Sequence, residues 1–167
     1  YLPLSHWLHE PAIGGGRIIG EVCHFVDFLT FLVGAAPLSV SAHALPGNGK
    51  YREDNVSMTF TFRDGSVGVV DYLANGDKSY PKERVEVFCG GRIAVLDDFR
   101  TLETVKDGRR KLVKHSQDKG WYHEWAAFAG AIRAGGPPPI PYEQLIGVTG
   151  ATFAAVESLR SGRRIEI

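Results

Sequence analysis

A histidine flanked by two carboxylates follows a run of glycines near the start of the chain. The segment reads Gly14-Gly15-Gly16-Arg17-Ile18-Ile19-Gly20-Glu21-Val22-Cys23-His24-Phe25-Val26-Asp27. Residues three or four positions apart are neighbours on a helix, so a helix here would place Glu21, His24 and Asp27 on one side, together with Arg17. Imidazole has an unperturbed pKa of roughly 6.5, which suits proton transfer near neutral pH. The segment predicts His24 as a general acid/base, with Glu21 or Asp27 as the acid that fixes its tautomer.

The other side of the same helix is apolar. Seven hydrophobic side chains recur there with a period near 3.6, namely Ile18, Val22, Phe25, Val26, Leu29, Leu32 and Val33. This pattern predicts a helix with one buried face. A histidine on such a helix is also commonly a plain surface residue, with the acids forming a solvated face, and spacing alone leaves that reading open.

The segment matches neither nucleotide-binding motif nor a helical zinc motif. Ile19 stands where the third glycine of a dinucleotide fingerprint belongs, and Glu21 stands where a phosphate-binding loop needs lysine. Glu21 and His24 also lack the four-residue spacing of a helical zinc motif, although His6 adds a further candidate ligand. We therefore predict no metal and no cofactor-binding residues in this chain.

Composition narrows the class of protein. The 167 residues carry 19 basic and 19 acidic side chains, which argues against a nucleic-acid or anionic-membrane partner. No apolar run reaches the length of a membrane span, and no signal peptide opens the chain. Cys23 and Cys89 have no metal-type spacing and suit a reducing compartment. We expect one cytoplasmic domain over residues 1–167 with a packed core.

The rest of the chain predicts strands followed by helices. Apolar and polar residues alternate over 56–62, and the turn pairs Asp64-Gly65, Gly90-Gly91 and Asp107-Gly108 separate strand-like runs. The expected strands cover 38–44, 56–62, 67–73, 84–89, 92–96, 101–106, 111–114 as an edge, and 164–167. The expected buried face of the next helix consists of Trp121, Trp125, Phe128 and Ile132, and a last helix over 145–159 closes at Gly162.

This order predicts an α+β fold in which an open, mostly antiparallel sheet has helices packed on one face. We expect the uncovered face to carry Ser57, Thr59, Thr61 and Tyr72. A separate polar loop over 75–84 presents Lys78 and Tyr80 as candidate binding residues; a solvated turn is the alternative.

The glycine-rich entry followed by His24 and Asp27 resembles the C-terminal domain of the glucose–fructose oxidoreductase, inositol dehydrogenase and MocA family. That family's pattern has an acid four residues before the histidine, whereas Gly20 stands there in this chain and the carboxylate is displaced to Glu21. Residues 85–91, 124–135 and 155–163 resemble later segments of the same domain, in the same order.

The resemblance implies a C-terminal substrate-binding and oligomerisation domain of an oxidoreductase that uses NAD or NADP and acts on a sugar, cyclitol or related polyol. The cofactor would bind mainly to a Rossmann domain that this chain lacks, and the chain begins at Tyr1, so we expect a piece of a longer protein. Arg17, Lys78 and Tyr80 would contact substrate, and a homo-oligomer would form through the open sheet face. The alternative is a non-catalytic sugar-binding or dimerisation module, so enzyme activity of the isolated chain stays undecided.

Overall fold

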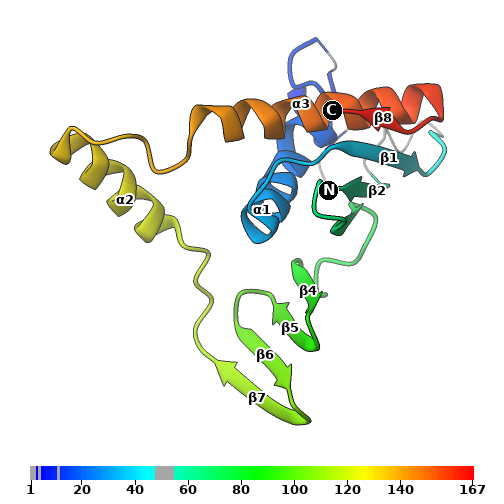
Figure 1. Ribbon diagram of the computed structural model, residues 1–167. Helices are drawn as coiled ribbons and strands as arrows, with labels where there is room; N and C mark the ends of the chain where they lie inside the picture. The colour runs from blue at the N-terminus through cyan, green and yellow to red at the C-terminus, as the bar shows by residue number, and fades with distance from the viewer. Residues whose placement is uncertain (1–2, 4, 11, 48–54) are drawn as a thin grey trace. The chain divides into compact units, whose positions relative to one another are not determined.

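The chain forms two units, which are described separately below (Figure 1). The computed structural model describes residues 3, 5–10, 12–47 and 55–167. Unit 1 comprises Tyr1–Asn75 and Ile140–Ile167, and unit 2 comprises the segment between them, Gly76–Pro139.

Unit 1 is a sheet with helices on one face. Its elements are η1 (Trp7–His9), η2 (Ile18–Val22), α1 (Cys23–Val33), β1 (Ser39–Ala44), β2 (Asn55–Thr61), β3 (Val67–Leu73), α3 (Tyr142–Ser161) and β8 (Ile165–Glu166). The strand order is β3-β2-β1-β8, and every neighbouring pair is antiparallel. The last strand therefore returns beside the first and closes the chain onto its own sheet.

Alternation along the strands builds the core of unit 1. Met58 and Phe60 of β2 are buried, whereas Ser57 and Thr59 between them are exposed. Side chains on one face of a strand alternate with those on the other, so the apolar set points toward the helices. α3 packs along β1, and α1 packs against α3 and β3. The apolar stripe predicted for α1 is buried at Ile18, Val22 and Val26, but Leu32 is exposed.

Tyr72 lies on the opposite face from the one predicted. It pairs with Val56, which is fully buried, and it packs against the core. Its neighbours Gly68 and Val70 are also buried, so the two-residue period of β3 turns Tyr72 toward the helices. The open face instead carries Ser57 and Thr59, together with the exposed β3 side chains Val67, Val69, Asp71 and Leu73.

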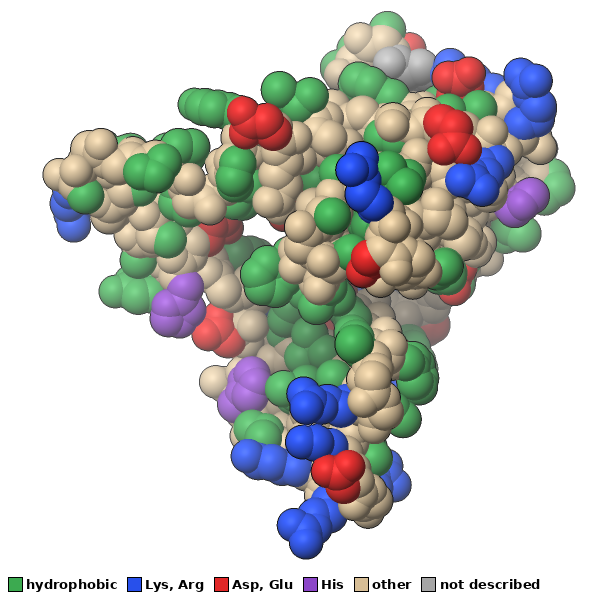
Figure 2. All heavy atoms as spheres, viewed as in Figure 1, with side chains coloured by type: hydrophobic (Ala, Val, Ile, Leu, Met, Phe, Trp, Pro, Cys, Tyr) green, Lys and Arg blue, Asp and Glu red, His purple; other side chains and the backbone are tan. Residues whose placement is uncertain are grey.

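Unit 2 is an antiparallel meander followed by a helix. Its elements are β4 (Arg84–Cys89), β5 (Arg92–Asp97), β6 (Thr101–Lys106), β7 (Arg109–Lys114) and α2 (Trp121–Ala134). β7 forms an edge of this sheet, as predicted, and its side chains are all exposed. Figure 2 shows the Lys and Arg side chains gathered over this sheet. Basic side chains on an edge strand oppose pairing with another chain.

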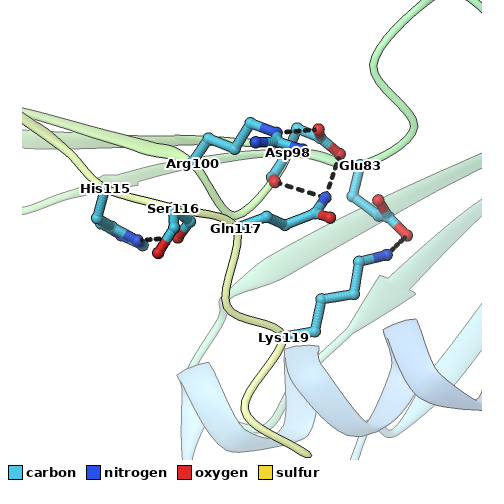
Figure 3. A network of polar contacts seen from close by, with 7 residues as sticks. All are labelled: Glu83, Asp98, Arg100, His115, Ser116, Gln117 and Lys119. Atoms are coloured by element: carbon cyan, nitrogen blue, oxygen red, sulfur yellow. Dashed lines mark hydrogen bonds and ion pairs between the residues drawn. The ribbon is translucent and has the colours of Figure 1, made fainter.

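A polar network joins the segment before α2 both to the turn between β5 and β6 and to Glu83, the residue before β4 (Figure 3). Nζ of Lys119 lies 2.8 Å from Oε1 of Glu83, and the amide of Gln117 donates to the backbone and side chain of Asp98. Asp98 and Phe99 both have positive φ, at 48° and 52°. Phe99 is unusual in this conformation, and the Lys119 ammonium lies 5.7 Å from the centre of its ring.

The prediction that the aromatic face of α2 is buried is wrong for the described residues. Trp121, Trp125, Phe128 and Ile132 are 70%, 69%, 48% and 65% exposed. The helix itself was predicted correctly and ends at Gly135, which has a left-handed φ of 60°. Periodicity identifies an apolar helix face, but it does not show that the same unit covers that face.

The α+β class and the antiparallel pairing are confirmed, and in unit 1 the helices α1 and α3 lie on one face of the sheet. The prediction of one sheet is wrong: the described strands form two four-stranded sheets, because β3 and β4 do not pair and Gly76 and Pro81 lie in the turn segment between them. The assignment of residues 1–167 to one domain stays a prediction. None of the helices in the described part of the chain is long and apolar enough to cross a membrane.

Candidate functional site

Two glycines turn the backbone into the helix that carries His24. Gly15 and Gly16 have φ values of 68° and 85°, in the left-handed region that favours glycine. A Cβ on Gly15 would also lie only 3.1 Å from Cδ1 of Ile19. The backbone path therefore favours glycine at both positions, and close packing against Ile19 favours it further at Gly15.

The helix begins with a π turn over Ile18–Val22, before the regular turns of α1. Single π turns occur inside α-helices and are frequent at functional sites. Ile18 and Val22 anchor this turn because they are 2% and 0% exposed. A π turn holds more residues than an α-turn, so Glu21 is rotated away from the position that a regular helix would give it relative to His24.

His24 is exposed on the outer side of α1. Among the described residues, no hydrogen bond or ion pair joins it to Glu21 or Asp27. The structure thus keeps the three side chains on consecutive turns but does not form the acid–imidazole contact that the spacing suggested. An exposed imidazole on a packed helix is free to meet a ligand, which is what a general acid/base requires.

Asp27 is engaged by another helix. Its Oδ1 accepts a hydrogen bond of 3.0 Å from Nε2 of Gln144, a residue of α3. Both residues are half-buried at the packing of α1 on α3. Gln144 lies 117 positions away in the chain, so no local signal in the sequence pointed to it.

Arg17 is held against the sheet. Its Nη1 donates a hydrogen bond of 2.9 Å to the hydroxyl oxygen of Tyr72 on β3. The ring of Tyr72 also packs edge-on against Phe25 of α1, with centroids 6.2 Å apart. Tyr72 was not predicted to contact any site residue, because it was assigned to the other face of the sheet. The contact fixes the start of the helix beside β3.

The two acids act electrostatically on Cys23, the first residue of α1. Burial raises the pKa of the Cys23 thiol above its ordinary value of 9.0, and the negative charges of Glu21 and Asp27 raise it further, against a backbone hydrogen bond at His24. Both carboxylates are therefore close enough to Cys23 to disfavour its thiolate. The thiol stays protonated at neutral pH and is a poor nucleophile.

Lys78 and Tyr80 lie in unit 2, within the turn that precedes β4. Ser79 donates hydrogen bonds to Oδ1 of Asp77 from its backbone N–H and from its hydroxyl, at 2.9 and 2.7 Å. These bonds lower the pKa of Asp77 and define a local turn. Both candidate side chains are exposed, and their role toward a substrate stays a prediction.

A groove of about 420 Å³ lies on unit 1 beside the glycine-rich entry. Gly15 and Ile19 form one wall, and the outer side of α3 forms the other through Phe153, Val156, Glu157 and Arg160. His24 is not among the residues that line it. The groove and the predicted acid/base are thus separate features of the glycine-rich entry.

The strands that the structure describes are not arranged as in a Rossmann dinucleotide site. Such a site requires parallel strands joined by a helical crossover, whereas all six strand pairs in the described ranges are antiparallel. The described residues also contain no group of three or more His, Cys, Asp or Glu side chains placed to hold a metal ion.

Solved structures share this fold at low sequence identity. Aldose-aldose oxidoreductase from Caulobacter crescentus, complexed with glycerol, is 16% identical with a TM-score of 0.81, covering 100% of this chain and 52% of its own. A putative NADPH-dependent oxidoreductase from Desulfitobacterium hafniense is 20% identical with a TM-score of 0.78, covering 97% and 51%. An oxidoreductase from Agrobacterium radiobacter, in complex with NAD+, L-tartaric acid and magnesium, is 16% identical with a TM-score of 0.74, covering 87% and 47%.

The chain spans about half the length of these structures. No curated protein matches it. The model of the GFO/IDH/MocA C-terminal domain matches residues 2–92, which include the glycine-rich entry, α1 and the strands β1, β2 and β3. Because this match covers more than half of the 167 residues, the chain belongs to the GFO/IDH/MocA family and carries its C-terminal domain.

Proposed function

We propose that this chain is the substrate-binding half of an NAD(P)-dependent oxidoreductase that acts on a sugar, cyclitol or related polyol, with His24 as general acid/base. The observation that carries the proposal is an exposed imidazole on a helix whose inner face is buried, directly after the glycine-rich entry, within the region that matches the family. Two of the similar structures contain glycerol or L-tartaric acid, and a further one is a UDP-N-acetylglucosamine 3-dehydrogenase from Acidithiobacillus ferrooxidans, which supports a hydroxylated substrate.

The proposed chemistry assigns proton transfer to this chain. The imidazole of His24 takes the proton from a substrate hydroxyl during oxidation and returns it during reduction. The nicotinamide cofactor supplies hydride transfer and is bound mainly by a part of the protein outside this chain. Arg17, Lys78 and Tyr80 are proposed to hydrogen-bond the substrate, with Glu21 supplying the negative charge beside His24 and Asp27 lying on the same helix, bonded to α3.

The test is turnover in the intact protein that carries this chain. Reduction of NAD+ and NADP+ is followed with glucose, glycerol, myo-inositol and L-tartrate as probes. His24→Asn is expected to lower kcat at least about a hundredfold, the scale of a lost general base. His123→Asn, which removes an exposed imidazole from α2, is the matched control and should leave the rate unchanged.

An unchanged rate in His24→Asn removes His24 from the mechanism. If no probe reduces either cofactor while the protein still binds polyols, the alternative function, a non-catalytic sugar-binding or dimerisation module, is favoured.

We also propose that the chain assembles into a homo-oligomer in the cytoplasm through the open face of the unit 1 sheet. Val67, Val69 and Leu73 are 63%, 56% and 63% exposed there, beside Ser57 and Thr59. Exposed apolar side chains on a sheet face favour association. Val69→Arg should reduce the mass measured by light scattering to that of a monomer, and a wild-type mass of one chain contradicts the assembly.

A further inference from the structure

Asp27 faces α3, and this contact suggests a role for it that differs from orienting the imidazole. We infer that Asp27 is a positioning residue: together with Gln144 it holds α1 against α3, and it acts on His24 only by fixing the helix that carries it. The inference rests on the proposed function for the importance of His24, but the contact itself is a property of unit 1.

The first argument is the direction of the carboxylate. Oδ1 of Asp27 accepts a hydrogen bond of 3.0 Å from Nε2 of Gln144. Hydrogen bonds to an ionised acceptor are stronger than neutral ones. In the described ranges of the chain, no bond leads from Asp27 to His24. The carboxylate is thus committed to α3, and the imidazole three residues earlier is exposed.

The second argument is the setting of the bond. Asp27 follows Val26, which is 1% exposed, and Thr30 one turn later is 4% exposed. Both belong to the side of α1 that is buried in unit 1. On α3, Gln144 sits in the first turn, where its backbone N–H bonds the carbonyl of Pro141. The hydrogen-bonded first turn of α3 therefore presents the amide to a stretch of α1 whose inner side chains are buried.

The third argument is chemical. Gln144 needs an acceptor oxygen, and an asparagine at position 27 offers one of the same shape without the charge. A residue that orients or charges an imidazole needs its carboxylate, because the negative charge stabilises the imidazolium. The substitution Asp27→Asn therefore separates the two roles, since it keeps the contact with α3 and removes the charge.

The experiment uses the 167-residue chain with the variants Asp27→Asn, Asp27→Leu, Gln144→Met and the double variant Asp27→Leu/Gln144→Met. Thermal unfolding is measured for each. Asp27→Leu and Gln144→Met should each lower the midpoint by about 2–4 °C, the effect of one lost hydrogen bond in a chain of this size. The double variant should fall no further than the larger of the two. Glu143→Gln, an exposed neighbour on α3, is the control.

A second measurement follows the ring nitrogens of His24 by NMR in the same chain, with the signal assigned by its loss in His24→Asn. The tautomer populations should be the same in wild type and in Asp27→Asn, which a purely orienting carboxylate would change. Additive losses in the double variant, or an altered tautomer in Asp27→Asn, overturn the inference. Neither readout requires turnover, so a failure here is distinct from a failure of His24→Asn in the activity assay.

Discussion

Leu29 of α1 lies directly against Gly68 of β3. A Cβ added there would lie 2.7 and 2.9 Å from the two methyl carbons of Leu29 and 3.3 Å from its Cγ. Atoms that close must move apart, so Gly68→Ala forces Leu29 out of its present position. The φ of Gly68 lies outside the left-handed region, so the strand backbone itself accepts alanine.

Two opposing effects set the size of the change. Replacing a strand glycine with alanine favours folding by roughly 0.5–1 kcal/mol, because glycine loses more conformational freedom. Overpacking in a well-packed core costs about 1–3 kcal/mol. Leu29 is only partly buried and can move, so we expect a net loss of about 1 kcal/mol for Gly68→Ala. In a Leu29→Ala background the overlap is gone, and Gly68→Ala should stabilise the chain by about 0.5 kcal/mol.

The assay is urea unfolding followed by circular dichroism for wild type, both single variants and the double variant. Equal m values across the four proteins show that the comparison concerns stability and not compactness. The sign of the Gly68→Ala effect should reverse between the two backgrounds. The same sign and size in both would show that Leu29 does not sit over Gly68, and the seating of α1 described above would be refuted.

Two further predictions concern the same unit. The pKa of the Cys23 thiol is raised in the folded state, so its contribution to stability is complete below the unfolded pKa and is lost as the pH rises through the folded pKa. The free energy of unfolding should therefore decline in alkaline solution. In urea unfolding measured over a range of pH, Cys23→Ala should flatten that decline and Cys89→Ala should not. Ser158→Ala should cost about 1–3 kcal/mol, because the buried hydroxyl oxygen accepts from Ala42 N–H at 3.0 Å and its removal leaves that donor unpaired. Ser161→Ala is its exposed control and should change the unfolding free energy by less than about 0.5 kcal/mol.

Local sequence patterns predicted most of the helices and strands. The predicted strands over 67–73, 84–89 and 101–106 have those bounds in the structure. Glycine-containing turns flank these strands, and apolar and polar residues alternate within them. What the patterns did not contain is which strands share a sheet. That depends on contacts between distant segments, and the interruption at Gly76 and Pro81 was read as a loop within one sheet.

The site was predictable to the level of the helix and no further. Glycines, periodicity and residue type placed His24 on a helix with a buried inner face, and the structure shows the imidazole exposed there. The pairing of His24 with Glu21 assumed a regular helix, whereas the helix opens with a π turn. The hydrogen-bond partner of Asp27 is Gln144, which lies 117 positions away in the chain, and helical periodicity cannot identify so distant a contact.

These observations separate stability from chemistry along α1. Its inner side chains pack against the rest of unit 1: Val26 lies in the core and Leu29 lies over Gly68. His24 on the outer side has no such commitment among the described contacts, so its removal should cost little folding energy. A substitution there that abolishes turnover while the unfolding midpoint stays constant can then be attributed to the reaction, and the same loss of turnover in Leu29→Ala would have to be attributed to displacement of the helix.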